Sequence, residues 1–532
     1  MPKKKQSPSQ PESPTPPGPQ TSARKCSKCL WWVLALVLIL LGLVGVGYLV
    51  LYGLQEKYAD DGDHFKYGSI GSDNLHGGFP YRILQVLPEM FPEHLPKNGR
   101  ASWEAFGLIT EKDKDRPIGF SKRWHLGIGD VLGPNCAFCH VSTLRQASGG
   151  EQKIILGMPG NTVNVEAFLR FLFAAAADER FTVDNVMKHI ERQRPLRWNE
   201  RLVHRCLLIP TFQEGILNLK HKYSFLDRMP THWGPGRVET WAIYKVLKLQ
   251  QRFRLLELLP EPGFPWIHTD AGPATGLSDF PALWPLKVDG KNLHWDGNLD
   301  DPEERNIIAA LGAGATPAAL DLESIQRIGR WIGGQLKPES YRDSSPQDKP
   351  QLAIKPDLLA RGEQIYSQVR GGYACADCHA RDGKRIVEVE RIDDIKTDHH
   401  RLEAFTEELK DKLNTIGDRS RWQLRHFKKT QGYANMLLDR VWLRAPYLHN
   451  GSVPTLRDLL KKPEDRPKMF YRGNDVYDWS NVGFKSDVAE EQGRKFFEYD
   501  TTLRGNGNGG HEYGTDLKDD EKGALIEYLK TL

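Results

Sequence analysis

The apolar positions of the chain fall into one long uninterrupted run near the start and several shorter periodic stretches further on. Residues 30–54 carry no charged side chain, and a helix of this length, at about 1.5 Å per residue, is long enough to span a bilayer. The pattern predicts one transmembrane helix over 30–54. The preceding residues 1–29 are rich in proline, serine, glutamine and lysine, which predicts a disordered tail.

Charged residues on the two sides of this run set its orientation. Six lysine and arginine residues precede it against a single acid, Glu12, whereas four acids follow it closely: Glu56, Asp60, Asp61 and Asp63. The positive-inside rule predicts a single-pass protein of the inner (cytoplasmic) membrane, with its N-terminus in the cytoplasm and residues from about 55 onward in the periplasm. A cleaved signal peptide is the alternative, but the run is too long and no Ala-x-Ala site follows it.

Later stretches repeat apolar residues at helical spacing. One places Gly362 beside Ile365 and Tyr366 on a single face. Two others predict closing helices, formed by Ile325, Ile328, Trp331, Ile332 and Leu336 in one, and by Leu517, Ala524, Leu525, Tyr528, Leu529 and Leu532 in the other, with Thr515 or Asp516 as its N-cap. Residues 337–350 are polar and contain prolines, so we place a domain boundary near 341–352.

Net charge excludes one class of partner. The chain carries a net charge of +4, and the six basic residues of the tail account for more than this excess, so the exported part is close to neutral. This charge distribution argues against a nucleic-acid-binding protein.

One five-residue pattern occurs twice, as Cys136-Ala-Phe-Cys139-His140 and Cys375-Ala-Asp-Cys378-His379. Two thiols at this spacing add to the two vinyl groups of one porphyrin, and the following imidazole binds the iron. With 7 Cys and 17 His in 532 residues, roughly 0.003 matches are expected by chance. A redox dithiol does not need the histidine, and neither motif has a second Cys-x-x-Cys nearby to complete a zinc site. The motifs predict two covalently bound haem c groups.

The remaining cysteines are not predicted to bind haem. Cys26 and Cys29 have the Cys-x-x-Cys spacing without a following histidine. Cys206 has apolar neighbours and is expected to be buried as a small hydrophobic residue.

The predicted fold is mainly α, with two cytochrome c-like haem domains that carry long loop insertions and follow one transmembrane helix. The N-terminal haem domain spans 55–340 and the C-terminal one 341–532. The second resembles cytochrome c at both ends, because in cytochrome c an opening helix with a Gly-x-x-x-aromatic pattern crosses the closing helix at a close-contact glycine.

The second axial ligand of each iron decides between electron storage and catalysis. For the second haem the leading candidate is His511, which lies on the glycine-rich loop 505–514, and the alternatives are His449 and Met469. Residues 141–336 offer no comparably placed ligand for the first haem, which predicts an open iron site. The dense aromatic and charged segment 293–298 forms either a turn with a buried tryptophan or a wall of the pocket at that haem.

Several segments resemble di-haem proteins of the rubber oxygenase type, within a wider group that includes bacterial di-haem cytochrome c peroxidases and the di-haem enzyme that matures methylamine dehydrogenase. These segments are residues 65–71, 117–122, 135–140, 294–298, 304–306, 445–456 and 510–514. The resemblance implies that the first haem, on His140, meets peroxide or dioxygen. It also implies that the second haem, on His379 with His511 as second ligand, relays electrons.

Three activities are compatible with this division. A peroxidase-like oxidoreductase takes electrons from a small exported donor protein or redox carrier and needs a polar group near the first haem, for which Glu239 and Arg305 are candidates. A dioxygenase acting on an apolar alkene needs an apolar pocket, for which Trp295 is the best candidate. A non-enzymatic electron carrier needs neither. The rubber oxygenases are secreted, whereas this chain is predicted to keep a membrane anchor. This difference favours the peroxidase-like activity.

Overall fold

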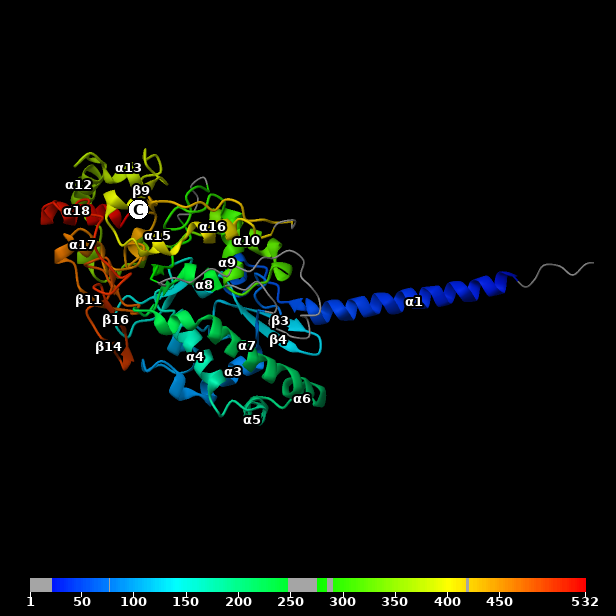
Figure 1. Ribbon diagram of the computed structural model, residues 1–532. Helices are drawn as coiled ribbons and strands as arrows, with labels where there is room; N and C mark the ends of the chain where they lie inside the picture. Colours follow the sequence, from blue (N-terminus) through cyan, green and yellow to red (C-terminus); the bar gives the residue numbers. More distant parts are fainter. Residues whose placement is uncertain (1–21, 76, 247–274, 285–289, 418–420) are drawn as a thin grey trace, which may run out of the picture.

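The computed structural model describes residues 22–75, 77–246, 275–284, 290–417 and 421–532. Helix accounts for about 43% and strand for 13%, so helices predominate but short strands are interspersed with them. Figure 1 shows a head from which one long helix, α1 (Ser22–Leu51), projects. The head is therefore a mixed structure rather than a plain helical bundle.

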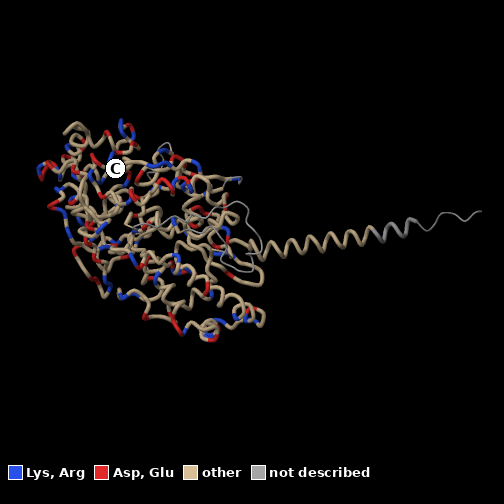
Figure 2. Tube along the Cα trace, viewed as in Figure 1, with Lys and Arg blue, Asp and Glu red and all other residues tan. Residues whose placement is uncertain are grey.

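The projecting helix differs from the predicted one at both ends. It begins at Ser22, inside the predicted tail, and ends at Leu51 rather than at residue 54. Residues 1–21 of the predicted tail lie outside the described residues. The apolar part, Leu30–Leu51, has a mean hydropathy of 2.9, is not buried inside the protein and carries no charge (Figure 2). Its length and composition suit a membrane anchor or a signal sequence.

The other helices are short, as expected for a chain that repeatedly turns around compact sites. In the first half they are α2 (Asp61–Tyr67), α3 (Tyr81–Met90), α4 (Val165–Ala177), α5 (Val183–Gln193), α6 (Trp198–Val203), α7 (Ile209–Lys222), α8 (Thr240–Val246), α9 (Pro302–Gly312) and α10 (Leu322–Gly334). In the second half they are α11 (Tyr341–Ser344), α12 (Pro356–Ser367), α13 (Cys375–His379), α14 (Ile392–Ile395), α15 (His400–Ala404), α16 (Glu407–Leu413), α17 (Leu456–Leu459) and α18 (Asp519–Leu529).

The strands are short, and several pair with segments that lie 40 or more residues away in the sequence, such as Leu54 with Trp124. One sheet of four strands has the order β1-β3-β4-β2, formed by Leu54–Gln55, Phe120–His125, Gly129–Pro134 and Phe79–Pro80. The remaining strands form two-stranded antiparallel pairs: β5 (Val141–Leu144) with β6 (Lys153–Leu156), β7 (Arg237–Val238) with β8 (Ser278–Asp279), β9 (Val389–Arg391) with β10 (Gly432–Ala434), β11 (Met469–Arg472) with β16 (Phe497–Asp500), β12 (Tyr477–Asp478) with β13 (Gly483–Phe484), and β14 (Glu490–Glu491) with β15 (Arg494–Lys495).

The predicted crossing of an opening and a closing helix is confirmed. Helices α12 and α18 pack against each other, and Figure 1 shows them side by side at the end of the head remote from α1. A Cβ atom added at Gly362 would lie 2.0 Å from the carbonyl oxygen of Ala524. Only a glycine allows the two backbones to come this close.

We expect the substitution Gly362→Ala to lower the free energy of unfolding by about 1–3 kcal/mol, because the new methyl group forces the two helices apart. Thermal unfolding followed by circular dichroism measures the change. Gly523→Ala on α18 is the matched control, since an added Cβ there meets no atom within 4 Å and alanine improves helix propensity by up to about 1 kcal/mol. Equal stability of the two variants would contradict close contact at Gly362.

Two local expectations are wrong. The closing helix α18 begins at Asp519 after Lys518, not after Thr515 or Asp516, and three acids in its first turn favour this later start through the helix dipole. Cys206 is exposed rather than buried. It lies in a π-helical turn, His204–Leu208, in which His204 and Leu208 take the inward positions.

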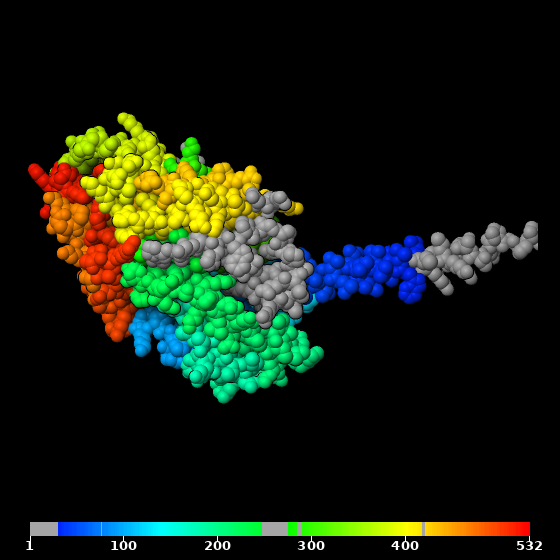
Figure 3. Space-filling model, viewed as in Figure 1, coloured from blue at the N-terminus to red at the C-terminus, as the bar shows by residue number. Residues whose placement is uncertain are grey.

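The residues at the predicted domain boundary are packed rather than free. Tyr341 is almost fully buried, and its ring meets the rings of Trp442 and Trp479 edge to face at 5.5 and 5.3 Å. One hydrophobic core contains residues from both sides of this boundary, including Trp331 and Trp442. Figure 3 shows one continuous body, in which the orange and red C-terminal segments lie directly beside the green ones.

A buried ion network also joins the two halves. Arg145, just after β5, pairs with Asp475 at 2.8 Å and with Glu491 at 2.5 Å. Asp475 also accepts a hydrogen bond from Thr143 and pairs with Arg494. Although burial opposes ionisation, these partners lower the pKa of Asp475 to about 2. The carboxylate therefore stays charged and holds the halves together at neutral pH.

Two candidate haem sites

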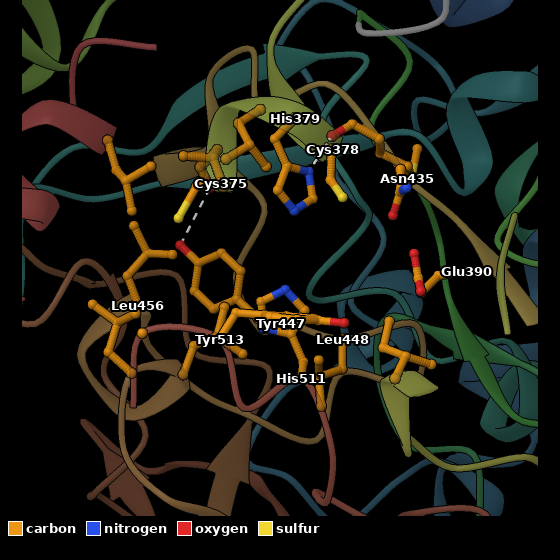
Figure 4. Close-up of a pocket in the computed structure, with 18 of the residues that line it drawn as sticks. Cys375, Cys378, His379, Glu390, Asn435, Tyr447, Leu448, Leu456, His511 and Tyr513 are labelled. Carbon is orange, nitrogen blue, oxygen red and sulfur yellow. Dashed lines mark hydrogen bonds between the residues drawn. The ribbon is translucent and has the colours of Figure 1, made fainter. Parts of the chain in front are cut away.

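The second Cys-x-x-Cys-His motif forms the one-turn helix α13, whose start is capped when the Asp377 carboxylate accepts the backbone N–H of Ala374. Cys375, Cys378 and His379 line a cavity of about 480 Å³ together with His511 (Figure 4). This volume lies within the range of about 300–1,000 Å³ that cofactor pockets take. The cavity places both thiols and both imidazoles around one interior space.

The two imidazoles of this cavity face each other in a way that suits one metal ion between them. Their ring centres are 6.3 Å apart. A metal ion bound to two imidazoles through bonds of about 2 Å holds the ring centres about 6 Å apart. His379 donates its Nδ1–H to the carbonyl oxygen of Met436 at 2.7 Å, which leaves Nε2 free, as in most metal-binding histidines. Burial lowers the pKa of both rings, that of His511 to about 4, so both are neutral and able to bind iron.

His511 is held in place by its backbone rather than by its ring. Its φ of +48° is in the left-handed region, and its N–H bonds to the carbonyl of Ile395 at 2.8 Å. The buried guanidinium of Arg466 donates to the carbonyl oxygens of Gly510 at 2.9 Å and of His511 at 3.3 Å. Neither ring nitrogen of His511 has a hydrogen-bond partner among the described residues. The ring is fixed in position and remains available as a ligand.

The two alternative ligands of the second haem are placed differently. His449 lines the same cavity, but its Nε2 lies 3.1 Å from the hydroxyl of Tyr433, and the two rings stack at 4.1 Å. Met469 lies on β11 with 48% of its surface exposed and does not line the cavity. Of the three sequence candidates, only His511 faces His379 with an unoccupied ring.

The first motif forms a 3-10 turn, Cys136–Phe138, followed by Cys139 and His140. Asn135 fixes its start, because its side chain accepts the N–H of Ala137 at 3.0 Å and donates to the carbonyl of Gly68 at 3.0 Å. Gly119 has a φ of +94°, and a Cβ there would lie 2.4 Å from the Cα of Phe138. Segments 65–71 and 117–122 thus support the motif directly.

His140 has the same local arrangement as His379. Its Nδ1–H donates to the carbonyl oxygen of Pro281 at 2.9 Å, and burial lowers its pKa to about 4. Burial also raises the pKa of Cys136 to about 11 and that of Cys139 to about 12, so neither forms a reactive thiolate at neutral pH. The aromatic ring nearest to His140 in the described part of the chain is Phe280, at 6.1 Å, and no second imidazole faces it there.

Each motif has a nearby arginine with a buried N–H group that lacks a partner. Nη1 of Arg305 on α9, near Cys136 and His140, and Nε of Arg444, near His379, have no partner within the described ranges. Burial lowers the pKa of each to about 10. A buried N–H group without an acceptor is costly, and an oxygen of a bound haem or of its ligand supplies one. These orphaned donors fit a haem at each motif.

Glu239 is not free to act on a substrate. Its carboxylate accepts the backbone N–H groups of Ala242, at the start of α8, and of Gly276 at 3.1 Å. Burial raises its pKa. The side chain is fully buried and caps the helix, so the structure gives it a structural contact where the sequence suggested a proton-transferring group.

The structure places Trp295 at the cavity of the second motif. We expected it in a pocket of the first haem, but its ring lines the cavity of the second motif, and its Nε1–H donates to the carbonyl of Asp279 at 2.8 Å. Phe280, whose ring lies against His140, lines the same cavity. Phe280 therefore lies between His140 and the cavity of the second motif.

Sequence reasoning missed Arg444 and Arg466. Arg444 directly precedes the segment 445–456, and its position beside that segment was the available signal. Arg466 lies in an ordinary charged stretch, and only the fold brings its guanidinium to the 505–514 loop.

One segment of the chain matches a known protein family. Residues 432–471 match the family model described as RoxA-like, cytochrome c-like. Two uncharacterized proteins of Sinorhizobium fredii are similar: y4iM is 28% identical over 312 residues, and y4iJ is 47% identical over 104 residues. The matches cover 50% and 18% of this chain, and 66% and 17% of those proteins. The matched segment contributes Tyr433, Arg444 and His449 to the cavity of the second motif, and it supports a cytochrome c of the RoxA-like kind with covalently bound haem and a haem-based redox function.

Proposed function

We propose that this protein is a membrane-anchored di-haem c-type cytochrome that reduces peroxide at the first motif with electrons relayed through the second. The overall reaction consumes two electrons and two protons for each hydrogen peroxide and releases two water molecules. The electrons come from a small exported redox protein or carrier.

The observation that carries this proposal is the inequality of the two motifs. His379 faces a second imidazole, His511, at 6.3 Å, whereas the ring against His140 is the side chain of Phe280. When bound, haem c supplies a redox-active iron that takes an outside ligand only where an axial position is free. The second site is therefore closed to peroxide and the first is open.

Arg305 is the residue that we assign to peroxide. Its Nη1–H group is buried, unpartnered and close to the first motif, while Nε and Nη2 are held by Asn306 at 3.1 and 2.9 Å. A fixed donor in a site that excludes water stabilises negative charge as it develops on an oxygen. Asn306 orients the guanidinium, so that the free N–H group points to one place.

Trp295 and Phe280 support the relay. Both rings line the cavity of the second motif, and Phe280 also lies against His140. Phe280 thus links the first motif to the cavity wall in which the ring of Trp295 lies. The hydrogen bond of Trp295 to Asp279 keeps its ring in the cavity wall.

The proposed location rests on α1. Its apolar part, Leu30–Leu51, is retained as a single-pass anchor in the cytoplasmic membrane, and the head lies in the periplasm, where c-type haems are attached. A tethered head suits a small diffusing peroxide and a small donor better than a bulky polymer.

We expect Arg305→Leu to lower kcat/KM for peroxide by about 100-fold, because one preorganised donor is lost. Peroxide consumption by the purified two-haem chain with a chemically reduced donor measures this, and absorption spectra report whether the second haem is unchanged. Arg330→Leu, which removes an exposed guanidinium from neighbouring α10, is the matched control and should leave the rate unchanged.

Two results would overturn the peroxidase assignment. Cleavage of an isoprenoid alkene with dioxygen, in the absence of peroxide turnover, would favour a dioxygenase. Failure of both haems to bind cyanide, together with no reaction with peroxide, would leave a non-enzymatic electron carrier.

A further inference from the structure

We propose that α6 and the loop before it rest in the headgroup region of an anionic phospholipid bilayer and fix the orientation of the head on the membrane. This membrane-contact patch consists of Trp198, Leu202, Arg192, Arg194 and Arg197. The inference rests on the proposed anchoring by α1 and adds a second contact that determines which side of the head faces the lipid.

The patch lies at the end of the head from which α1 emerges. In Figure 1, α6 reaches as far toward the membrane side as the point where α1 leaves the head. The β3–β4 hairpin holds the last turn of α1 through two hydrogen bonds. The N–H of Leu126 donates to the carbonyl oxygen of Leu49 at 3.0 Å, and Nδ1 of His125 donates to the carbonyl oxygen of Val50 at 3.0 Å. A fixed exit of α1 holds α6 near the bilayer surface.

The apolar part of the patch has no partner in the described part of the molecule. Trp198 is 79% exposed and Leu202 is 55% exposed. They are four positions apart on α6, so both project from one face of the helix. The inward side of the next turn is filled by His204 and Leu208. An outward tryptophan and leucine on one turn are poorly placed in water and well placed in the interfacial region of a bilayer.

The charged part of the patch is uncompensated. Arg201 pairs with Glu191 at 2.6 Å, and Arg205 pairs with Asp184. Across the ranges that the structure covers, the guanidinium groups of Arg192, Arg194 and Arg197 make no ion pair. Unpaired arginines near an anionic lipid surface are attracted to it. Long arginine side chains also reach the phosphates while their stems lie on apolar surface.

Aromatic residues at the same level support a lipid rather than a protein as the occupant. Tyr48 and Tyr52 stack at 5.2 Å at the outer end of α1, and Trp124 on β3 is 40% exposed. Tryptophan and tyrosine gather at the membrane–water interface. Trp198 of the patch adds to these aromatic residues on the surface of the head. Figure 3 shows the corresponding teal surface at the lower right as a projecting lobe.

Photocrosslinking in nanodiscs tests the proposal. The full two-haem chain is placed in nanodiscs of phosphatidylcholine and phosphatidylglycerol that contain a lipid with a photoreactive group near its headgroup. We expect mass spectrometry to find crosslinks in residues 192–205 at least about tenfold above those around Val369. Val369 is also exposed, at 63%, but it follows α12 at the end of the head opposite α1.

Variants separate the contributions. The double variant Trp198→Ser with Leu202→Ser should reduce crosslinking of 192–205 to the level around Val369 while the haem absorbance still elutes with the nanodiscs. The triple change of Arg192, Arg194 and Arg197 to glutamine should give a reduction similar to the one that omission of phosphatidylglycerol causes. Crosslinking equal to that around Val369 in the unaltered chain would overturn the proposal. Elution of haem apart from the nanodiscs would instead refute anchoring by α1.

Discussion

A chain in which Cys136 and Cys139 are both replaced by serine is expected to carry one covalent haem instead of two and to reduce peroxide at least about 100-fold more slowly. The thioether bonds of the first haem cannot form, while the second motif is left intact. Intact-protein mass spectrometry counts the haems, and peroxide consumption with a reduced donor measures the activity. The second haem should retain its low-spin absorption spectrum.

The matched variant replaces Cys375 and Cys378 by serine. It should also carry one haem, but that haem should still bind cyanide, because the open site is kept, and it should turn over slowly for lack of a relay. If the first variant kept the peroxide activity and the second lost cyanide binding, the roles of the two motifs would be reversed.

Replacing His511 with alanine should convert the second haem from low spin to high spin. His379 remains as the only imidazole on that iron, and the free position accepts water or cyanide. Electron paramagnetic resonance and absorption spectroscopy detect the change as complete loss of one low-spin signal. We also expect the rate of electron delivery to peroxide to fall by roughly tenfold or more, since a bis-imidazole iron is suited to electron transfer.

His449→Ala is the control for this prediction, since His449 lines the same cavity but its nitrogen lies beside Tyr433. It should leave the low-spin signal in place. A low-spin second haem in the His511 variant together with a high-spin one in the His449 variant would move the ligand to His449. Arg466→Met should weaken the His511 ligation without removing it, because Arg466 holds only the backbone of that loop.

Local patterns in the sequence predicted most of the helices that flank the second site. Gly362, Ile365 and Tyr366 share a face of α12, as their spacing indicates, and Gly362 meets α18 where a close-contact glycine was expected. The stripe of Ile325, Ile328, Trp331 and Ile332 lies in α10. The spacing of apolar residues predicts these helices because each of them buries one face against a neighbour. A buried face places apolar residues every three or four positions.

Long-range positions were not predictable in the same way. Trp295 was expected at the first motif but lines the cavity of the second. Its sequence neighbours do not reveal which motif the turn faces. Glu239 suggested chemistry, yet the fold uses both of its oxygens for backbone N–H groups. The contact of Arg466 with the 505–514 loop depends on segments about 40 residues apart, which no spacing rule connects.

The packing of Tyr341 between Trp442 and Trp479 has a consequence for how electrons move. Since one core runs through both motif-bearing halves, the separation of the two sites is a constant of the molecule and not a variable that hinge bending adjusts. Under the proposed relay, electronic coupling between the two sites is then the same in every turnover. The encounter with the donor, and the oxidation state in which the donor leaves the pair of haems, would then control the rate.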